Sequence, residues 1–104
     1  MKTSEFVAQA RDEIHGGWVQ GSYRNEQGVC ILGALDRVAL RNLQAGGVQA
    51  RAVAQQEIEK MAQELFPDIW RGDIPALNDM FRTTKDDVLN LMDKTIIGLE
   101  EHGQ

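Results

Sequence analysis

One segment of this chain repeats apolar residues at the spacing of an α-helix so clearly that it sets the fold class. Between residues 50 and 65, apolar positions recur every three or four residues, and polar or charged residues fill the opposite face. The apolar positions are Ala50, Val53, Ala54, Ile58, Met61, Ala62 and Leu65. This periodicity predicts an amphipathic helix that packs one face on a core and ends at Phe66-Pro67.

Two further helices are predicted before this segment. The first has Ser4 as its expected N-cap and ends at Gly16-Gly17, because glycines are common helix stops. The second is expected to start near Val29 or Cys30 and to run to about Leu43. Its inward face consists of Ile31, Ala34, Leu35, Val38 and Ala39.

The stretch from Gly16 to Leu35 is rich in glycine and does not have the spacing of a plain amphipathic helix. Residues 18–28 are expected to form a loop or a short hairpin, with Asn25-Glu26-Gln27-Gly28 as its turn. Gly33 lies inside the second predicted helix, where glycine costs about 1 kcal/mol relative to alanine. A close helix crossing is the expected reason for this glycine.

The C-terminal part contains one more helix. Residues 68–82 are predicted to be irregular, with a single helical turn starting at Pro75. Thr84 and Asp87 have the spacing of a capping box, with aspartate in place of the usual glutamate, and they predict the start of the last helix. The sequence therefore predicts one all-α domain over residues 1–104, a compact bundle of about four helices with an irregular loop or short hairpin after the first.

Composition limits the classes of function. The chain has 42% hydrophobic and 26% charged residues, which is typical of a globular domain, and its net charge of −5 disfavours nucleic acid as a partner. Its single cysteine cannot form an intramolecular disulfide, which favours a reducing compartment. We find no apolar run that resembles a signal peptide or a membrane span, so a cytoplasmic location without membrane contact is expected.

Four short motifs appear in a fixed order along the chain. They are Gly17-Trp18-x-Gln20-Gly21, Gly28-x-Cys30-x-x-Gly33-Ala34-Leu35, Asn78-Asp79-x-x-x-Arg82-Thr83 and Val88-Leu89-x-Leu91-Met92-Asp93-Lys94-x-Ile96. This set resembles a family of small uncharacterised proteins from actinobacteria and their phages, a domain of unknown function. Leu77 departs from the family pattern, which tends to have an aromatic residue there. The resemblance implies an actinobacterial or actinophage origin and a shared architecture, and it implies no activity.

Six residues of these motifs are interpreted as structural: Trp18, Gln20, Cys30, Gly33, Asn78 and Asp79. Trp18 is expected to be largely buried against the second helix. The amide and carboxylate side chains are expected to bind nearby main-chain groups, as such side chains usually do in irregular segments. Asn78 or Asp79 is expected to brace the turn before Thr84.

Cys30 is also the only candidate nucleophile of a cysteine-dependent enzyme, with His15 and Asp79 as possible partners. Such a site needs a base within hydrogen-bond reach of the sulfur, and the sequence spacing neither supports nor excludes this. A free cysteine more often packs as a small buried apolar residue. The two histidines, His15 and His102, do not have metal-ligand spacing, so no metal and no cofactor is expected.

A helix-turn-helix DNA-binding protein is the first alternative function. The second predicted helix, the turn Ala45-Gly46-Gly47 and the third predicted helix have the outline of this motif. Gln49, Arg51 and Gln55 would then contact bases, because arginine and glutamine read guanine and adenine. The acidity of the chain and the small number of cations on this helix count against this function.

Protein binding is the predicted function. The connection from Phe66 to Phe81 contains many apolar residues and no regular element that could bury them all, and exposed apolar clusters usually mark interaction sites. Trp70, Arg71 and Ile74 are the predicted contact surface for a second copy or a different protein. The sequence thus predicts a non-enzymatic cytoplasmic protein-binding module whose partner, if a phage encodes it, is a host factor.

Overall fold

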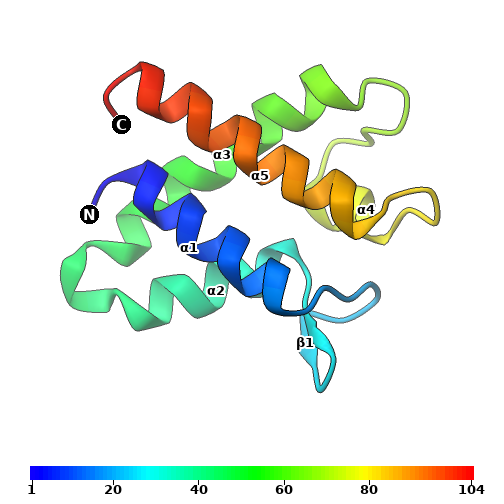
Figure 1. Cartoon of the computed structure of the whole chain (residues 1–104), viewed down its shortest axis with the longest axis horizontal. Helices are drawn as coiled ribbons and strands as arrows, with labels where there is room; N and C mark the ends of the chain where they lie inside the picture. Colours follow the sequence, from blue (N-terminus) through cyan, green and yellow to red (C-terminus); the bar gives the residue numbers. More distant parts are fainter.

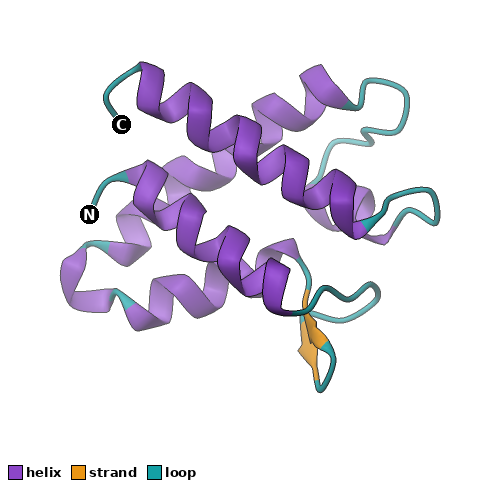
Figure 2. Cartoon of the chain, viewed as in Figure 1, coloured by secondary structure: helices purple, strands orange, loops and turns teal.

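A computed structural model describes all residues from Met1 to Gln104. Its elements, in chain order, are α1 (Thr3–Gly16), β1 (Arg24–Asn25), β2 (Gly28–Val29), α2 (Ile31–Arg41), the 3-10 helix η1 (Leu43–Ala45), α3 (Gly47–Leu65), α4 (Ile74–Asp79) and α5 (Lys85–Glu101). Four long helices form the bundle, and a small hairpin follows α1 (Figures 1 and 2). The predicted all-α fold of about four helices is therefore confirmed.

The first helix, α1, is at the centre of the helix packing. It contacts α2, α3 and α5, and α3 in turn packs against both α2 and α5. In Figure 1, α1 and α5 lie side by side in front of α2 and α3. The Cα radius of gyration is 12.6 Å, which agrees with the value of about 13 Å expected for a compact chain of this length.

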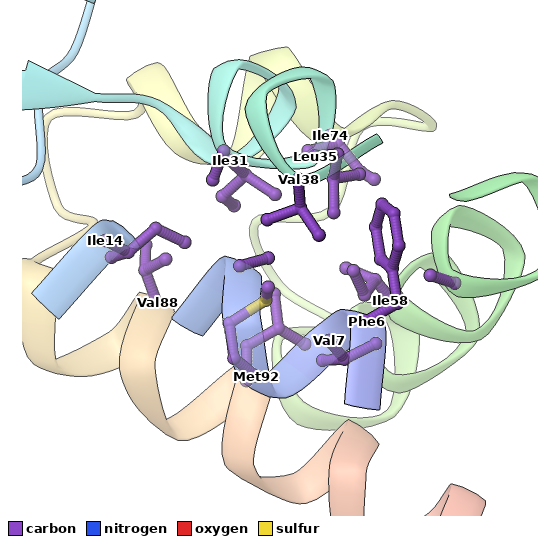
Figure 3. Packing of buried hydrophobic residues seen from close by; sticks show 14 of the residues in the cluster. Phe6, Val7, Ile14, Ile31, Leu35, Val38, Ile58, Ile74, Val88 and Met92 are labelled. Carbon is purple, nitrogen blue, oxygen red and sulfur yellow. The ribbon is translucent and has the colours of Figure 1, made fainter. Parts of the chain in front are cut away.

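One hydrophobic cluster of 20 buried residues joins all the long helices, the hairpin and α4. Figure 3 shows that Ile14 of α1 lies beside Val88 of α5 in this cluster, whereas Phe6 of α1 lies beside Ile58 of α3. The last helix contributes four residues to this cluster: Val88, Leu91, Met92 and Leu99. The helical spacing of the sequence thus identified most of the core.

The predicted helix ends are partly right. The capping box at α5 is confirmed: Thr84 Oγ1 accepts the Asp87 N–H, and the Asp87 carboxylate accepts the Thr84 N–H. The helical turn predicted to start at Pro75 is present as α4, which begins at Ile74 and is capped by Asp73 Oδ1.

The prediction for Ser4 was wrong. The α1 helix begins at Thr3, its N-cap is Lys2, and no side chain caps it. Ser4 is buried in the first turn, and its N–H donates to the Gln104 carbonyl at 3.0 Å. The Gln104 carbonyl therefore satisfies one N–H group in the first turn of α1, which no side chain caps.

The third helix, α3, spans Gly47–Leu65, and its predicted end at Phe66 is confirmed. One residue of its predicted apolar face is misplaced: Val53 is 40% exposed. The buried residues of α3 are Gly47, Ala50, Ala54, Ile58 and Ala62, which recur every three or four positions. This narrow buried stripe, in which all residues but Ile58 are small, does not include Val53.

The hairpin after α1 is present and explains Gly33. Arg24 pairs with Val29, and Asn25 pairs with Gly28, so the predicted turn is confirmed. A Cβ atom built on Gly33 would collide with the carbonyl oxygen of Tyr23. The expected helix crossing at Gly33 was wrong, because the backbone that approaches this glycine belongs to the hairpin.

Replacing Gly33 with alanine is expected to destabilise the domain. Alanine favours a helix by about 1 kcal/mol over glycine, but the collision with Tyr23 moves the hairpin away from α2, and overpacking of this kind costs about 1–3 kcal/mol. Chemical denaturation measures the free energy of unfolding of the Gly33→Ala variant.

Gly98 of α5 provides the matched control. A Cβ atom there meets only the Met61 methyl group at 3.9 Å, so Gly98→Ala is expected to stabilise the domain by up to about 1 kcal/mol. If both variants gained stability, the hairpin would not be seated on α2 at Gly33.

Candidate functional site

The buried side chain of Asn78 joins three parts of the chain that are far apart in sequence. Its Oδ1 atom accepts hydrogen bonds from Trp18 Nε1 at 2.8 Å and from the Ile31 N–H at 3.1 Å. Its Nδ2 atom donates to the Val19 carbonyl at 3.0 Å and to Asp79 Oδ1 at 2.9 Å. With only 1% of Asn78 exposed, its amide group connects α4 to the loop after α1 and to the start of α2.

Gln20 and Asp79 complete this connection. Gln20 Nε2 donates to the carbonyls of Asn78 and Met80 at 3.0 and 2.9 Å, and Asp79 Oδ1 accepts the Gly21 N–H at 2.9 Å. These side chains bind main-chain groups, as the sequence indicated. The expected brace of the turn before Thr84 is not among their contacts.

Thr83 provides that brace instead. Its Oγ1 atom donates to the Leu77 carbonyl at 2.8 Å, and its N–H donates to the Met80 carbonyl. A threonine just after a short helix can satisfy a carbonyl of the helix end in this way. The assignment of Asn78 or Asp79 to this turn was wrong because both side chains bind residues of the loop after α1.

Trp18 is half-buried, so the expectation that it is largely buried was too strong. Its ring packs against the hydrophobic cluster, and its indole N–H binds Asn78. The backbone here is also fixed, because the Val19 N–H donates to the Val29 carbonyl at 3.0 Å. Trp18 therefore holds the loop to the body of the bundle.

Cys30 is the N-cap of α2. Its sulfur is buried and accepts the Gly33 N–H at 3.3 Å, which is a capping contact. Neither His15 nor Asp79 forms a hydrogen bond with this sulfur: His15 is exposed at the end of α1, and Asp79 binds Gly21 and Asn78. The three residues do not form the hydrogen-bonded set that a cysteine nucleophile requires.

The predicted contact surface around Trp70 is mostly packed on the core. Ile74 is 1% exposed and belongs to the hydrophobic cluster, so it cannot contribute to a surface. Trp70 is partly buried against the same cluster. Arg71 is exposed, but its guanidinium group donates to the carbonyls of Asp68 and Trp70. The sequence predicted only a single turn starting at Pro75. The structure has a helix, α4, that begins at Ile74 and buries this side chain.

An apolar groove lies elsewhere, between the hairpin, α2 and the first turns of α3. Its volume is about 540 Å³. The residues that line this apolar groove are Tyr23, Arg24, Gly33, Asp36, Arg37, Ala39, Leu40, Leu43, Val48 and Arg51. Tyr23, Leu40, Leu43 and Val48 are large apolar residues of which 57–67% is exposed.

The sequence contains a pattern that could have indicated this groove: apolar residues that lie off the predicted inward faces of the helices. Leu40 and Leu43 fall outside the inward face of the second predicted helix, and Val48 falls outside that of the third. Apolar side chains off the buried face of an amphipathic helix must be exposed unless another element covers them. No element of the chain covers these three, so they form a surface.

Several charged residues in and beside the groove form ion pairs. Arg51 Nη2 lies 2.8 Å from Asp36 Oδ1. Glu13 is shared by two arginines, with Arg41 Nη1 at 2.6 Å and Arg37 Nη1 at 2.9 Å. The hydrogen bond from Arg41, together with that from Arg37, lowers the pKa of Glu13 below its ordinary value, although partial burial opposes the shift.

The residues proposed to contact DNA are not arranged as a free basic surface. Gln49 is exposed and Gln55 is half-buried, whereas the guanidinium group of Arg51 is paired with Asp36. The connection from α2 to α3 contains η1 and Gly46 in the left-handed region at φ 82°. This geometry joins two helices of a bundle, and it offers few free cations to phosphate groups.

The fold and the groove define a small helical domain with an exposed apolar groove. The model of a family of unknown function (DUF6197) matches residues 1–97, and the chain therefore belongs to this family. None of the curated proteins matches the chain, and none of the solved structures does. The predicted membership of a family of unknown function is thus confirmed.

Two further observations concern ligands and membranes. The chain contains no group of three or more His, Cys, Asp or Glu side chains that could hold a metal ion. None of its helices combines the length and the apolar character needed to cross a bilayer.

Removal of the Asn78 side chain is expected to destabilise the domain strongly. The Asn78→Ala variant leaves the Trp18 N–H, the Ile31 N–H and the Val19 carbonyl without a partner, and each unsatisfied buried group costs about 1–3 kcal/mol. Urea denaturation is expected to show a loss of at least about 3 kcal/mol. Asn90→Ala, at an exposed position of α5, is the control and changes stability by about 0.5 kcal/mol or less.

Glu13 is expected to make stability depend on acid pH. The pKa of Glu13 is lowered in the folded state. Its contribution to the free energy of unfolding is therefore fully present above the ordinary carboxyl pKa, and it is lost as the pH falls through the folded-state pKa. Glu13→Gln should therefore lower the free energy of unfolding by about 1 kcal/mol near neutral pH and by nothing in strong acid. Glu64→Gln is the control, because Glu64 is exposed and forms no ion pair. A Glu13→Gln effect that does not change with pH would contradict this role.

Proposed function

We propose that this domain is a non-enzymatic protein-binding module and that the apolar groove accepts a segment of its partner. The observation that carries the proposal is the exposure of Tyr23, Leu40, Leu43 and Val48 along one groove. Contiguous exposed apolar side chains are costly in water and usually mark interaction sites. Arginine and tyrosine at the margin of such a patch are typical of protein interfaces.

The proposed contact surface is the groove, whereas the sequence predicted a surface around Trp70. Trp70 and Ile74 pack on the core, whereas Leu40, Leu43 and Val48 do not. The cellular setting remains that indicated by the sequence: a cytoplasmic protein of actinobacterial or actinophage origin, with a host protein as the partner if a phage encodes it.

The two alternatives have weaker support. An enzyme that uses Cys30 would need a base near the sulfur, and the sulfur binds the Gly33 N–H instead. A DNA-binding protein would need free cations on α3, and Arg51 is paired with Asp36 in a chain with a net charge of −5. The groove is also lined by the apolar residues Leu40, Leu43 and Val48, which suit side chains of a protein better than phosphate groups.

Site-directed photo-crosslinking tests the proposal. A photoreactive amino acid at position 43 of the full chain is expected to crosslink one protein in an actinobacterial lysate. The same amino acid at position 97 is the matched control, because Ile97 is also an exposed apolar residue and lies on α5, away from the groove. Mass spectrometry identifies the crosslinked protein and the segment that is attached.

Substitution of Leu40, which lines the groove, completes the test. Leu40→Asp places a carboxylate in the groove and is expected to weaken binding of the crosslinked protein by at least about tenfold, the loss typical of one central interface residue. Ile97→Asp is expected to have no effect on this affinity. Both residues are exposed, so melting temperatures should stay close to that of the unsubstituted protein. Equal crosslinking from positions 43 and 97, or no crosslink from position 43, would overturn the proposal.

A further inference from the structure

The charged side chains that line the apolar groove are mainly basic. Three arginines, Arg24, Arg37 and Arg51, line it together with one carboxylate, that of Asp36. The whole chain has a net charge of −5, so this lining has the opposite sign to the rest of the molecule. A basic groove on an acidic protein attracts acidic partners and repels basic ones. On this charge pattern, and resting on the proposed function above, we infer that the groove accepts an acidic amphipathic helix of a partner protein.

Internal carboxylates neutralise these three arginines only in part. Arg24 forms no ion pair, and Arg37 shares the single carboxylate of Glu13 with Arg41. Asp36 binds one Nη atom of Arg51, and the buried Nε–H of Arg51 has no acceptor. The guanidinium groups therefore keep positive charge and free donors, which suits carboxylates that approach from a partner.

The apolar residues of the groove suit a helix better than an extended strand. Leu40 and Leu43 follow each other at a spacing of three residues, and Val48 lies in the first turn of α3. These side chains line one groove where α2 is connected to α3, and a partner helix can place residues spaced by three and four positions against them. The free edge of β1 has only two residues, which is too short for a partner strand to add to it.

A second copy of this chain is a poor occupant for the groove. In a symmetric dimer through this surface, the same patch faces itself, so the arginines of one copy would face those of the other. Like charges that face each other across an interface oppose association. A head-to-tail contact between the groove and the exposed acidic residues of α5 (Asp86, Asp93 and Glu100) would not close into a dimer. The charge pattern therefore favours a different protein with an acidic helix.

Two synthetic peptides of about 18 residues, or five helical turns, test the inference with the full chain. Both carry leucines at the same helical spacing, but one has glutamates and the other has lysines at the flanking positions. Fluorescence anisotropy is expected to show at least about tenfold tighter binding of the acidic peptide near 50 mM salt, and the difference should shrink near 300 mM salt. Amide resonances of Tyr23, Leu40, Leu43 and Val48 are expected to shift when the acidic peptide is added.

A charge reversal at the groove provides the matched comparison. Arg24→Glu is expected to weaken binding of the acidic peptide about fivefold at low salt, because it reverses an unpaired charge at the rim. Lys94→Glu changes the net charge equally on the exposed face of α5 and is expected to change affinity by less than about twofold.

Several results would overturn the inference. Equal binding of the two peptides in the groove would refute the acidic partner, although a groove-dependent crosslink from position 43 would still support protein binding. Failure of the acidic peptide to bind, or shifts outside the groove, would refute it as well. A DNA duplex that shifts Gln49 and Arg51 more strongly than the acidic peptide does would replace the inferred helix with nucleic acid. Only preferential, Arg24-dependent binding of the acidic peptide in the groove supports the inference.

Discussion

The amide group of Asn78 is the interaction on which the arrangement of the non-helical segments depends. Its four hydrogen bonds connect the loop after α1, the start of α2 and the end of α4. A buried amide is costly unless each of its donors and acceptors is satisfied, and here each one is. Because these contacts fix the start of α2, they also fix the direction in which α2 leaves the hairpin. The apolar groove lies along that helix, so its shape depends on contacts between residues that do not line it.

The sequence predicted the helices well because their apolar residues recur at a regular spacing. The core residues Ile31, Leu35 and Ile58 were all assigned in this way, and the Thr84–Asp87 capping box was predicted from its residue types and their spacing. The contact between Gly33 and Tyr23 could not be predicted. A glycine inside a helix indicates that another backbone comes close, but the sequence does not show which backbone it is. Three of the four hydrogen-bond partners of the Asn78 side chain lie 47 to 60 residues away along the chain, and periodicity carries no information about such pairs.

The candidate site was harder to predict than the fold. The sequence pointed to Trp70 and Ile74 because aromatic and apolar residues gather there, but α4 buries Ile74 and the core covers part of Trp70. Leu40, Leu43 and Val48 lie at helix ends, where a sequence alone does not show whether another segment covers an apolar side chain. The groove is open because no other segment of the chain covers these three side chains. Exposure is a property of the whole fold, so it became visible only with the structure.

The long separations across the Asn78 contacts also have a kinetic consequence. Trp18 and Asn78 are 60 residues apart, so they meet only after much of the chain has become ordered, whereas turns within α1, α3 and α5 form locally. Contacts that form after the transition state control how fast a protein unfolds, and they have little effect on how fast it folds. The contacts between α4 and the loop after α1 are therefore expected to form late in folding, as are other contacts between distant segments. Changes to these contacts are expected to alter the unfolding rate more than the folding rate.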